Sequence, residues 1–119
     1  NDSATIDAYD TSNITVADAV IVKACNSSKV VAYGSTYIEA YDSSNVEAYC
    51  SSIVKAYDSS FIEAYGYSTA IANDSARVEA YGYSSVKATK DVRVNIFSEN
   101  VNISGDIIKD NILELKGKK

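Results

Sequence analysis

An eight-residue repeat runs through most of this chain and constrains its fold more than any other feature. Val or Ile occupies nearly every eighth position from Ile6 to Val94, and Ala70 is the exception. Ala follows two positions later in most units, then Tyr or Phe, then Asp, Gly or Asn before two Ser or Thr residues. No insertion or deletion interrupts the pattern between residues 6 and 97. We therefore expect a stack of short, nearly identical structural units.

The spacing within each unit predicts a β-strand followed by a turn. Ser or Thr, then Val or Ile, then Ala lie two residues apart, which is the alternation of a strand with one buried face. β-Branched and aromatic residues favour strands, whereas Asp, Gly, Asn and Ser favour turns. A helix would need a period of about 3.6, and eight does not keep one helical face apolar. The inward Ser hydroxyls must be hydrogen-bonded, and turn backbone offers the simplest partners.

A second period, of two such units, sets the size of the coil. The turn position is Asp-like in one set of alternate units and Gly-like in the other; the members are Asp10, Asn26, Asp42, Asp58 and Asp74, and Gly34, Cys50, Gly66 and Gly82. Two strands and two distinct turns per 16-residue repeat predict an all-β fold, a flattened, two-sided parallel β-solenoid with six coils between residues 6 and 101. A three-sided coil would repeat every three units, and the turn columns do not. Handedness is not encoded in the pattern, and right-handed is the default because parallel crossovers favour it.

The frame of the repeat is lost beyond Asn102. The stretch from residue 106 to residue 115 is strongly apolar. We therefore divide the chain into a solenoid array at residues 1–101 and a C-terminal cap or junction at residues 102–119. A cap would cover the strand edge that an open solenoid end exposes.

Composition argues against several classes of function. The net charge of −5 disfavours nucleic acid as a partner, and the chain has no His, the commonest general base. It has no Gly-x-Ser-x-Gly motif, and its glutamates are interpreted as solvent-exposed strand positions. We expect no enzyme activity, no cofactor and no membrane span. The N-terminal part of the chain contains no signal-peptide pattern, and the chain starts inside a repeat without Met, as expected for a piece of a longer protein.

The aromatic column is the first candidate site. It comprises Tyr33, Tyr49, Tyr65, Tyr81 and Phe97, which the 16-residue coil stacks along one edge. Stacked rings stabilise the edge by about 0.5–1.5 kcal/mol per pair. The same rings could instead form a docking stripe for a second protein chain or for sugar rings. These three interpretations remain open at the level of sequence.

The aspartate column and the cysteines are weaker candidates. Asp10, Asp42, Asp58 and Asp74 would stack at the opposite edge, where Ca²⁺ would relieve their repulsion, or each would accept hydrogen bonds from its own turn amides. We favour the turn role and expect no metal. Cys25 and Cys50 fall at opposite edges, beyond the reach of a disulfide, and are expected to be free thiols.

The repeat resembles that of bacterial ice-nucleation proteins. The resemblance rests on the octapeptide, its pairing into 16, Tyr-Gly-Ser-Thr at residues 33–36 and Tyr-Asp-Ser-Ser at residues 41–44 and 57–60. It implies a long solenoid with tyrosine ladders that pair chains, and outward Thr-x-Thr arrays that order water. Here the outward columns mix Lys, Glu, Tyr and Ile. The chain is also similar to octad arrays of repetitive bacterial and phage proteins.

These observations together predict a non-catalytic structural module. We expect a rigid rod or spacer of a bacterial or phage surface protein or fibre, which self-associates or contacts neighbouring domains of the same protein. Binding of ice or ordered water is the first alternative, and carbohydrate binding is the second. The expected location is a cell surface, the extracellular space or a virion.

Overall fold

The computed structural model of this chain describes residues 4–17, 20–89, 91–107 and 111–114. Its strands form two sheets of seven strands each. Sheet A contains β1 (Ala4–Ala8), β3 (Val20–Ala24), β5 (Tyr37–Ala40), β7 (Ile53–Ala56), β9 (Thr69–Ala72), β11 (Ser85–Ala88) and β13 (Asn102–Gly105). Sheet B contains β2 (Asn13–Val16), β4 (Lys29–Ala32), β6 (Asn45–Ala48), β8 (Phe61–Ala64), β10 (Arg77–Ala80), β12 (Arg93–Ile96) and β14 (Ile112–Glu114).

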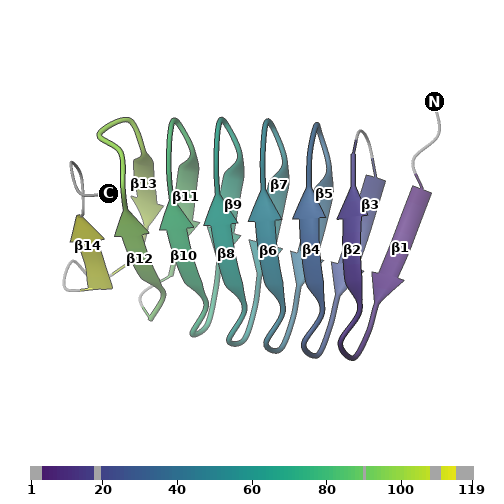
Figure 1. The fold of residues 1–119 in the computed structure, drawn as a ribbon. Coiled ribbons are helices and arrows are strands. Elements are labelled where there is room, and N and C mark those ends of the chain that lie inside the picture. Colours follow the sequence, from purple (N-terminus) through teal and green to yellow (C-terminus); the bar gives the residue numbers. More distant parts are fainter. Residues whose placement is uncertain (1–3, 18–19, 90, 108–110, 115–119) are drawn as a thin grey trace.

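The chain alternates between the two sheets, so each strand pairs in parallel with the strand two further along. In sheet A, Ile38 of β5 pairs with Val54 of β7, and in sheet B, Val46 of β6 pairs with Ile62 of β8. In both pairs the partners are two octapeptide units apart, as the second sequence period predicts. The two-sided parallel β-solenoid predicted from the repeat is therefore confirmed (Figure 1).

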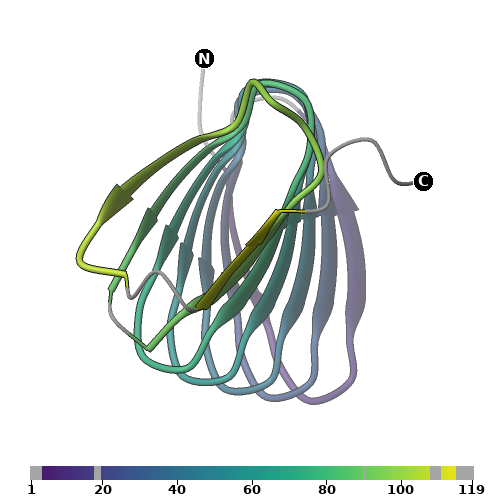
Figure 2. The same ribbon diagram turned by 90° about the vertical axis from the view of Figure 1, so that its left-hand side faces the viewer.

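The path of the chain also gives the hand of the coil. Seen from the C-terminal end, the chain rises along sheet B, crosses the top and descends along sheet A while it advances toward the viewer (Figure 2). This anticlockwise, approaching path is a right-handed coil. It agrees with the preference of parallel crossover connections for the right hand.

The last coil keeps the sheets but changes the spacing. Asn102 of β13 pairs with Ser85, which lies 17 residues earlier in the chain. Ile112 of β14 pairs with Val94, which lies 18 residues earlier, whereas the repeat spacing is 16. Strand pairing needs matching alternation of apolar residues, whereas the turns can take extra residues without breaking it. The strands therefore continue past the point where the sequence frame is lost. Of the predicted cap or junction, residues 108–110 and 115–119 lie outside the described part of the chain.

Small apolar side chains from both sheets fill the space between them. The Val/Ile column and the Ala column point inward from both sheets, and Val22, Val54 and Ala56 are completely buried. Each coil buries its apolar face largely against its neighbours, so stability depends on the stack.

The inward Ser and Thr hydroxyls meet the turn backbone, as predicted. Each donates to the carbonyl oxygen three residues earlier, at 2.7 Å from Ser44 to Tyr41 and 2.8 Å from Thr36 to Tyr33. The same bond forms from Ser28, Ser52, Ser60, Ser68 and Ser84. Within the described residues, every buried side-chain nitrogen or oxygen has a hydrogen-bond partner. The core is thus apolar in its middle and polar at both edges, where every buried polar side-chain atom of the described residues has a hydrogen-bond partner.

The turns explain why the chain alternates Asp-like and Gly-like residues. The residue after the aromatic column has a positive φ in both turn series, for example 60° at Asp58 and 62° at Gly66. Gly adopts this left-handed conformation at no steric cost, and Asp and Asn tolerate it better than other residues. Turn amides also bond between coils, as from Ser59 to the Asp42 carbonyl at 2.9 Å. The hydrogen-bond ladder therefore continues around the turns.

Candidate functional site

The predicted aromatic column lies along the edge where the chain leaves sheet B. This edge is the upper one in Figure 1, and its turns follow β4, β6, β8, β10 and β12. We call it the aromatic edge. Its rings come from Tyr33, Tyr49, Tyr65, Tyr81 and Phe97.

The five rings stack face to face without a gap. Successive centroids are 4.9, 4.7, 4.6 and 4.6 Å apart, and the planes are inclined by 6–12°. The spacing follows the distance of about 4.8 Å between neighbouring strands. A tyrosine ladder is thus a direct result of the 16-residue coil. Tyr33 is 43% exposed, and Tyr49, Tyr65 and Tyr81 are half-buried, so one side of the ladder faces solvent.

A second aromatic row on the same edge was not singled out from the sequence. Tyr67 and Tyr83 follow the left-handed glycines Gly66 and Gly82, and their rings stack at 5.2 Å. They are 67% and 53% exposed, more than any other large hydrophobic side chain except Tyr9 and Leu113 among the described residues. The matching Tyr-Gly-Tyr-Ser segments, one coil apart in the sequence, were the available signal. The aromatic edge is therefore wider than the predicted column.

The hydroxyls of Tyr49, Tyr65 and Tyr81 each donate a hydrogen bond to the glutamate two residues earlier. Tyr49 donates to Glu47 at 3.1 Å, and Tyr81 donates to Glu79 at 3.1 Å. Burial, followed by the charge of Glu79, raises the pKa of Tyr81 to about 12. Burial and the Glu63 charge likewise raise the pKa of Tyr65 well above its usual range. The hydroxyls of Tyr65 and Tyr81 therefore stay neutral donors at physiological pH.

The glutamates themselves form a row rather than scattered, solvated positions. Glu47, Glu63 and Glu79 are direct neighbours in sheet B. Burial, then the charges of Glu47 and Glu79, raises the pKa of Glu63. Their outward position on the sheet is as predicted, although they are half-buried, and the 16-residue coil aligns them on successive strands. On sheet A the charges alternate instead, since Lys23 pairs with Glu39 and Glu39 with Lys55.

The opposite edge is acidic. Its turns contain the aspartate column, and the carboxylates of Asp42, Asp58 and Asp74 accept bonds at 3.0–3.1 Å from the backbone amides of the preceding coil. The sequence predicted amides of the same turn. The neighbouring coil supplies them instead because successive turns stack within side-chain reach. A shorter ring stack, Tyr41 on Tyr57 at 5.0 Å, lies beside this column.

The remaining candidates are Asp10 and the two cysteines, and they do not form a site together within the described residues. Asp10 is exposed at the N-terminal end of the aspartate column. The described residues include no group of three or more carboxylates or cysteines placed to hold a metal ion. Cys25 and Cys50 are both free thiols, as predicted. Burial, then the charges of Asp42 and Asp7, raises the pKa of Cys25, which keeps that thiol protonated.

Comparisons with protein-family models, characterised proteins and solved structures found no match to this chain. The described part of the chain contains no helix of the length and apolarity needed to cross a bilayer.

Proposed function

We propose that this chain is a structural module, a rigid rod or spacer that pairs with a second copy through the aromatic edge. The observation that carries the proposal is the contrast between the two edges. The aromatic edge presents two stacked rows of rings, with Gly, Cys and Ser at its described turn positions. The other edge presents a column of aspartates.

Charge favours association through the aromatic edge. Two copies brought together at their aspartate edges would repel each other, in a chain whose net charge is −5. Among the described turns of the aromatic edge, Glu99 after β12 contributes a carboxylate, and the turns after β4, β6, β8 and β10 contribute none. The ladder glutamates lie on the sheet face beneath the hydroxyls. A two-fold dimer needs a surface that is complementary to itself, and evenly spaced rings offer one at every coil.

The rod role is supported by the unbroken pairing of the coils. Each sheet continues through seven strands, and the inner column is apolar from end to end. The resemblance of the octapeptide to bacterial repeat proteins supports a place in a surface protein or fibre. The outward columns mix charged, aromatic and aliphatic residues, which favours a rod over a regular array that orders ice.

The oligomeric state tests this proposal. Light scattering over a concentration series at two salt levels should show a dimer that salt does not dissociate, because its contacts are aromatic. The double variant Tyr49→Ser and Tyr65→Ser should weaken the dimer at least tenfold. The matched control, Tyr41→Ser and Tyr57→Ser, removes a similar ring stack from the aspartate edge and should leave the dimer intact.

Two outcomes would contradict the proposal. A strict monomer at high concentration rules out pairing through the ladder. Equal weakening by the two double variants shows that loss of stability, not loss of the interface, separates the copies. Circular dichroism of each variant verifies that the solenoid itself is retained.

A further inference from the structure

The outer face of sheet B changes from acidic to basic along the rod. Its middle column contains the glutamate row, which ends at Glu79 and is followed by Asn95 and Leu113. The column nearer the start of each strand becomes cationic over the same coils, as Phe61 is followed by Arg77 and then Arg93. A local basic patch thus lies at one end of an acidic chain.

The two arginines of this patch are direct neighbours. Arg77 of β10 pairs in register with Arg93 of β12, and adjacent strands lie about 4.8 Å apart. Like charges placed opposite each other destabilise a sheet. No carboxylate among the described residues forms a salt bridge with either guanidinium. Asp91 lines a small hollow together with both arginines. The Arg77–Arg93 pair is therefore not matched by a salt bridge among the described residues, whereas charges of opposite sign alternate on sheet A.

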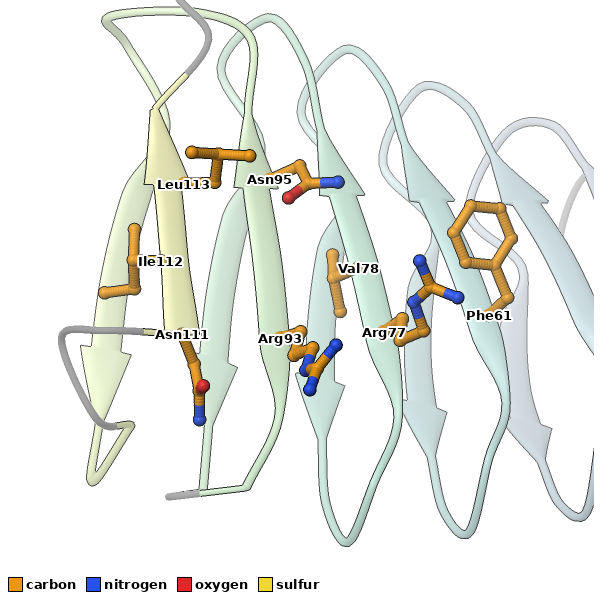
Figure 3. Close-up of a pocket in the computed structure, with 8 residues that line it drawn as sticks. All are labelled: Phe61, Arg77, Val78, Arg93, Asn95, Asn111, Ile112 and Leu113. Atoms are coloured by element: carbon orange, nitrogen blue, oxygen red, sulfur yellow. The ribbon is translucent and has the colours of Figure 1, made fainter.

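A hollow of about 440 Å³ opens over the two arginines (Figure 3). Its walls come from β8, β10, β12 and β14, and the side chains that bear on the argument are Phe61, Arg77, Arg93, Asn95, Asn111 and Leu113. No carboxylate belongs to the described lining. The Arg77 guanidinium lies over the Phe61 ring, 6.0 Å from its centroid, and this contact holds it at the hollow.

The lining defines the chemistry of a ligand. Arginine side chains from two neighbouring strands can reach the oxygens of one carboxylate or sulfate group, which guanidinium groups bind through paired hydrogen bonds. The amides of Asn95 and Asn111 can both donate and accept, as sugar hydroxyls require. Leu113 is 54% exposed and offers an apolar wall. The volume falls in the range of small-molecule sites, which combine apolar walls with a few polar groups.

We propose that this hollow binds an acidic sugar, with its carboxylate or sulfate group between Arg77 and Arg93 and its hydroxyls against Asn95 and Asn111. Phe61 is a positioning residue that fixes the Arg77 guanidinium. The bound anion would relieve the repulsion between the two arginines. This site lies on the sheet B face, away from the tips of the aromatic edge, and does not depend on the proposed pairing of rods.

Calorimetric titration at low salt tests the site with three probes. These are a galacturonic acid trisaccharide, the uncharged galactose trisaccharide of the same linkage, and sodium sulfate. The acidic trisaccharide should saturate one site per chain, and the uncharged one should not bind measurably. Arg93→Gln should weaken binding of the acidic trisaccharide at least tenfold, and Arg93→Lys less, because Lys keeps the charge but not the fork. Lys87→Gln removes the same charge from sheet A and should change affinity less than twofold.

A second pair of measurements separates a sugar site from a simple anion site. Asn95→Ala should weaken the acidic trisaccharide about fivefold and leave sulfate unaffected. If sulfate binds as tightly as the trisaccharide, or if Asn95→Ala changes nothing, the sugar assignment is overturned. Absence of saturable binding at millimolar trisaccharide, or an equal loss for Lys87→Gln and Arg93→Gln, overturns the site altogether. All four substitutions are at surface positions of the outer sheet faces, so the fold is expected to survive them.

Discussion

At the residue scale, the left-handed turn positions impose the strictest local requirement on the sequence. Cys50 and Gly66 occupy the same position in neighbouring coils, with φ of 63° and 62°. A Cβ added at Gly66 would lie 3.2 Å from the Cys50 amide nitrogen, which is tighter than ordinary contact. The left-handed turn conformation therefore suits Gly66, which has no Cβ, and strains Cys50, which has one.

Exchanging these two residue types gives opposite changes in stability. Gly66→Ala should lower the free energy of unfolding by about 1 kcal/mol, because left-handed backbone disfavours residues with a Cβ. Cys50→Gly should change it by less, and toward stability, since relief of strain outweighs the added freedom of the unfolded chain. Urea unfolding of both variants measures this. A Gly66→Ala protein as stable as the parent would contradict the positive φ.

At the scale of the element, the contribution of an outward side chain to stability depends on the residues at the same position of the two neighbouring strands. Glu63 lies between Glu47 and Glu79 on sheet B, whereas Glu39 lies between Lys23 and Lys55 on sheet A. The residue type is the same, but the neighbours have opposite charge. This difference makes the two glutamates a matched pair.

Neutralising the two glutamates should have opposite effects. Glu63→Gln is expected to raise stability at pH 7 by about 0.5 kcal/mol, because it removes repulsion and Gln still accepts the Tyr65 bond. Since the folded-state pKa of Glu63 is raised, the charged form destabilises the fold above that pKa, and the gain should vanish as pH falls below about 4.5. Glu39→Gln should lower stability slightly. Unfolding curves at pH 7 and pH 4 test both, and equal shifts would contradict the charge argument.

The ladder strands also predict how stability changes in alkali. The pKa of Tyr81 is raised from 10.0 to about 12 in the folded state, so its proton is held more tightly there than in the unfolded chain. Its contribution is complete below pH 10 and is lost as pH rises toward 12. Tyr81→Phe keeps a ring in the stack and should make the alkaline fall in stability shallower. An unchanged slope between these pH values would show that the Tyr81 hydroxyl is not held by burial and Glu79.

At the scale of the whole molecule, the repeat made most of the architecture predictable. Inward and outward positions, the coil length and the stacking of Tyr33 to Phe97 all follow from a fixed step of two octapeptide units. What the repeat could not supply were features that depend on departures from it. The wider spacings at β13 and β14 concern turn lengths, which the strand pattern does not determine. The hollow over Arg77 and Arg93 likewise depends on which residues occupy the variable outward positions of neighbouring strands.

A stack of coils should be most stable in its middle. Ile62 of β8 is fully buried between coils on both sides, whereas Ile14 of β2 pairs only with β4 and is half-buried. Both substitutions to Ala delete the same atoms from the same inward column. Ile62→Ala should lower the free energy of unfolding by about 3 kcal/mol, within the range for buried Ile, and Ile14→Ala by about half as much.

Nearest-neighbour coupling adds a second expectation, because a destabilised end coil can open while the rest stays folded. Amide exchange should therefore quicken in β2 alone for Ile14→Ala, but in β6, β8 and β10 together for Ile62→Ala. Equal losses of stability, with exchange raised uniformly in both variants, would show that the chain unfolds as one cooperative unit instead.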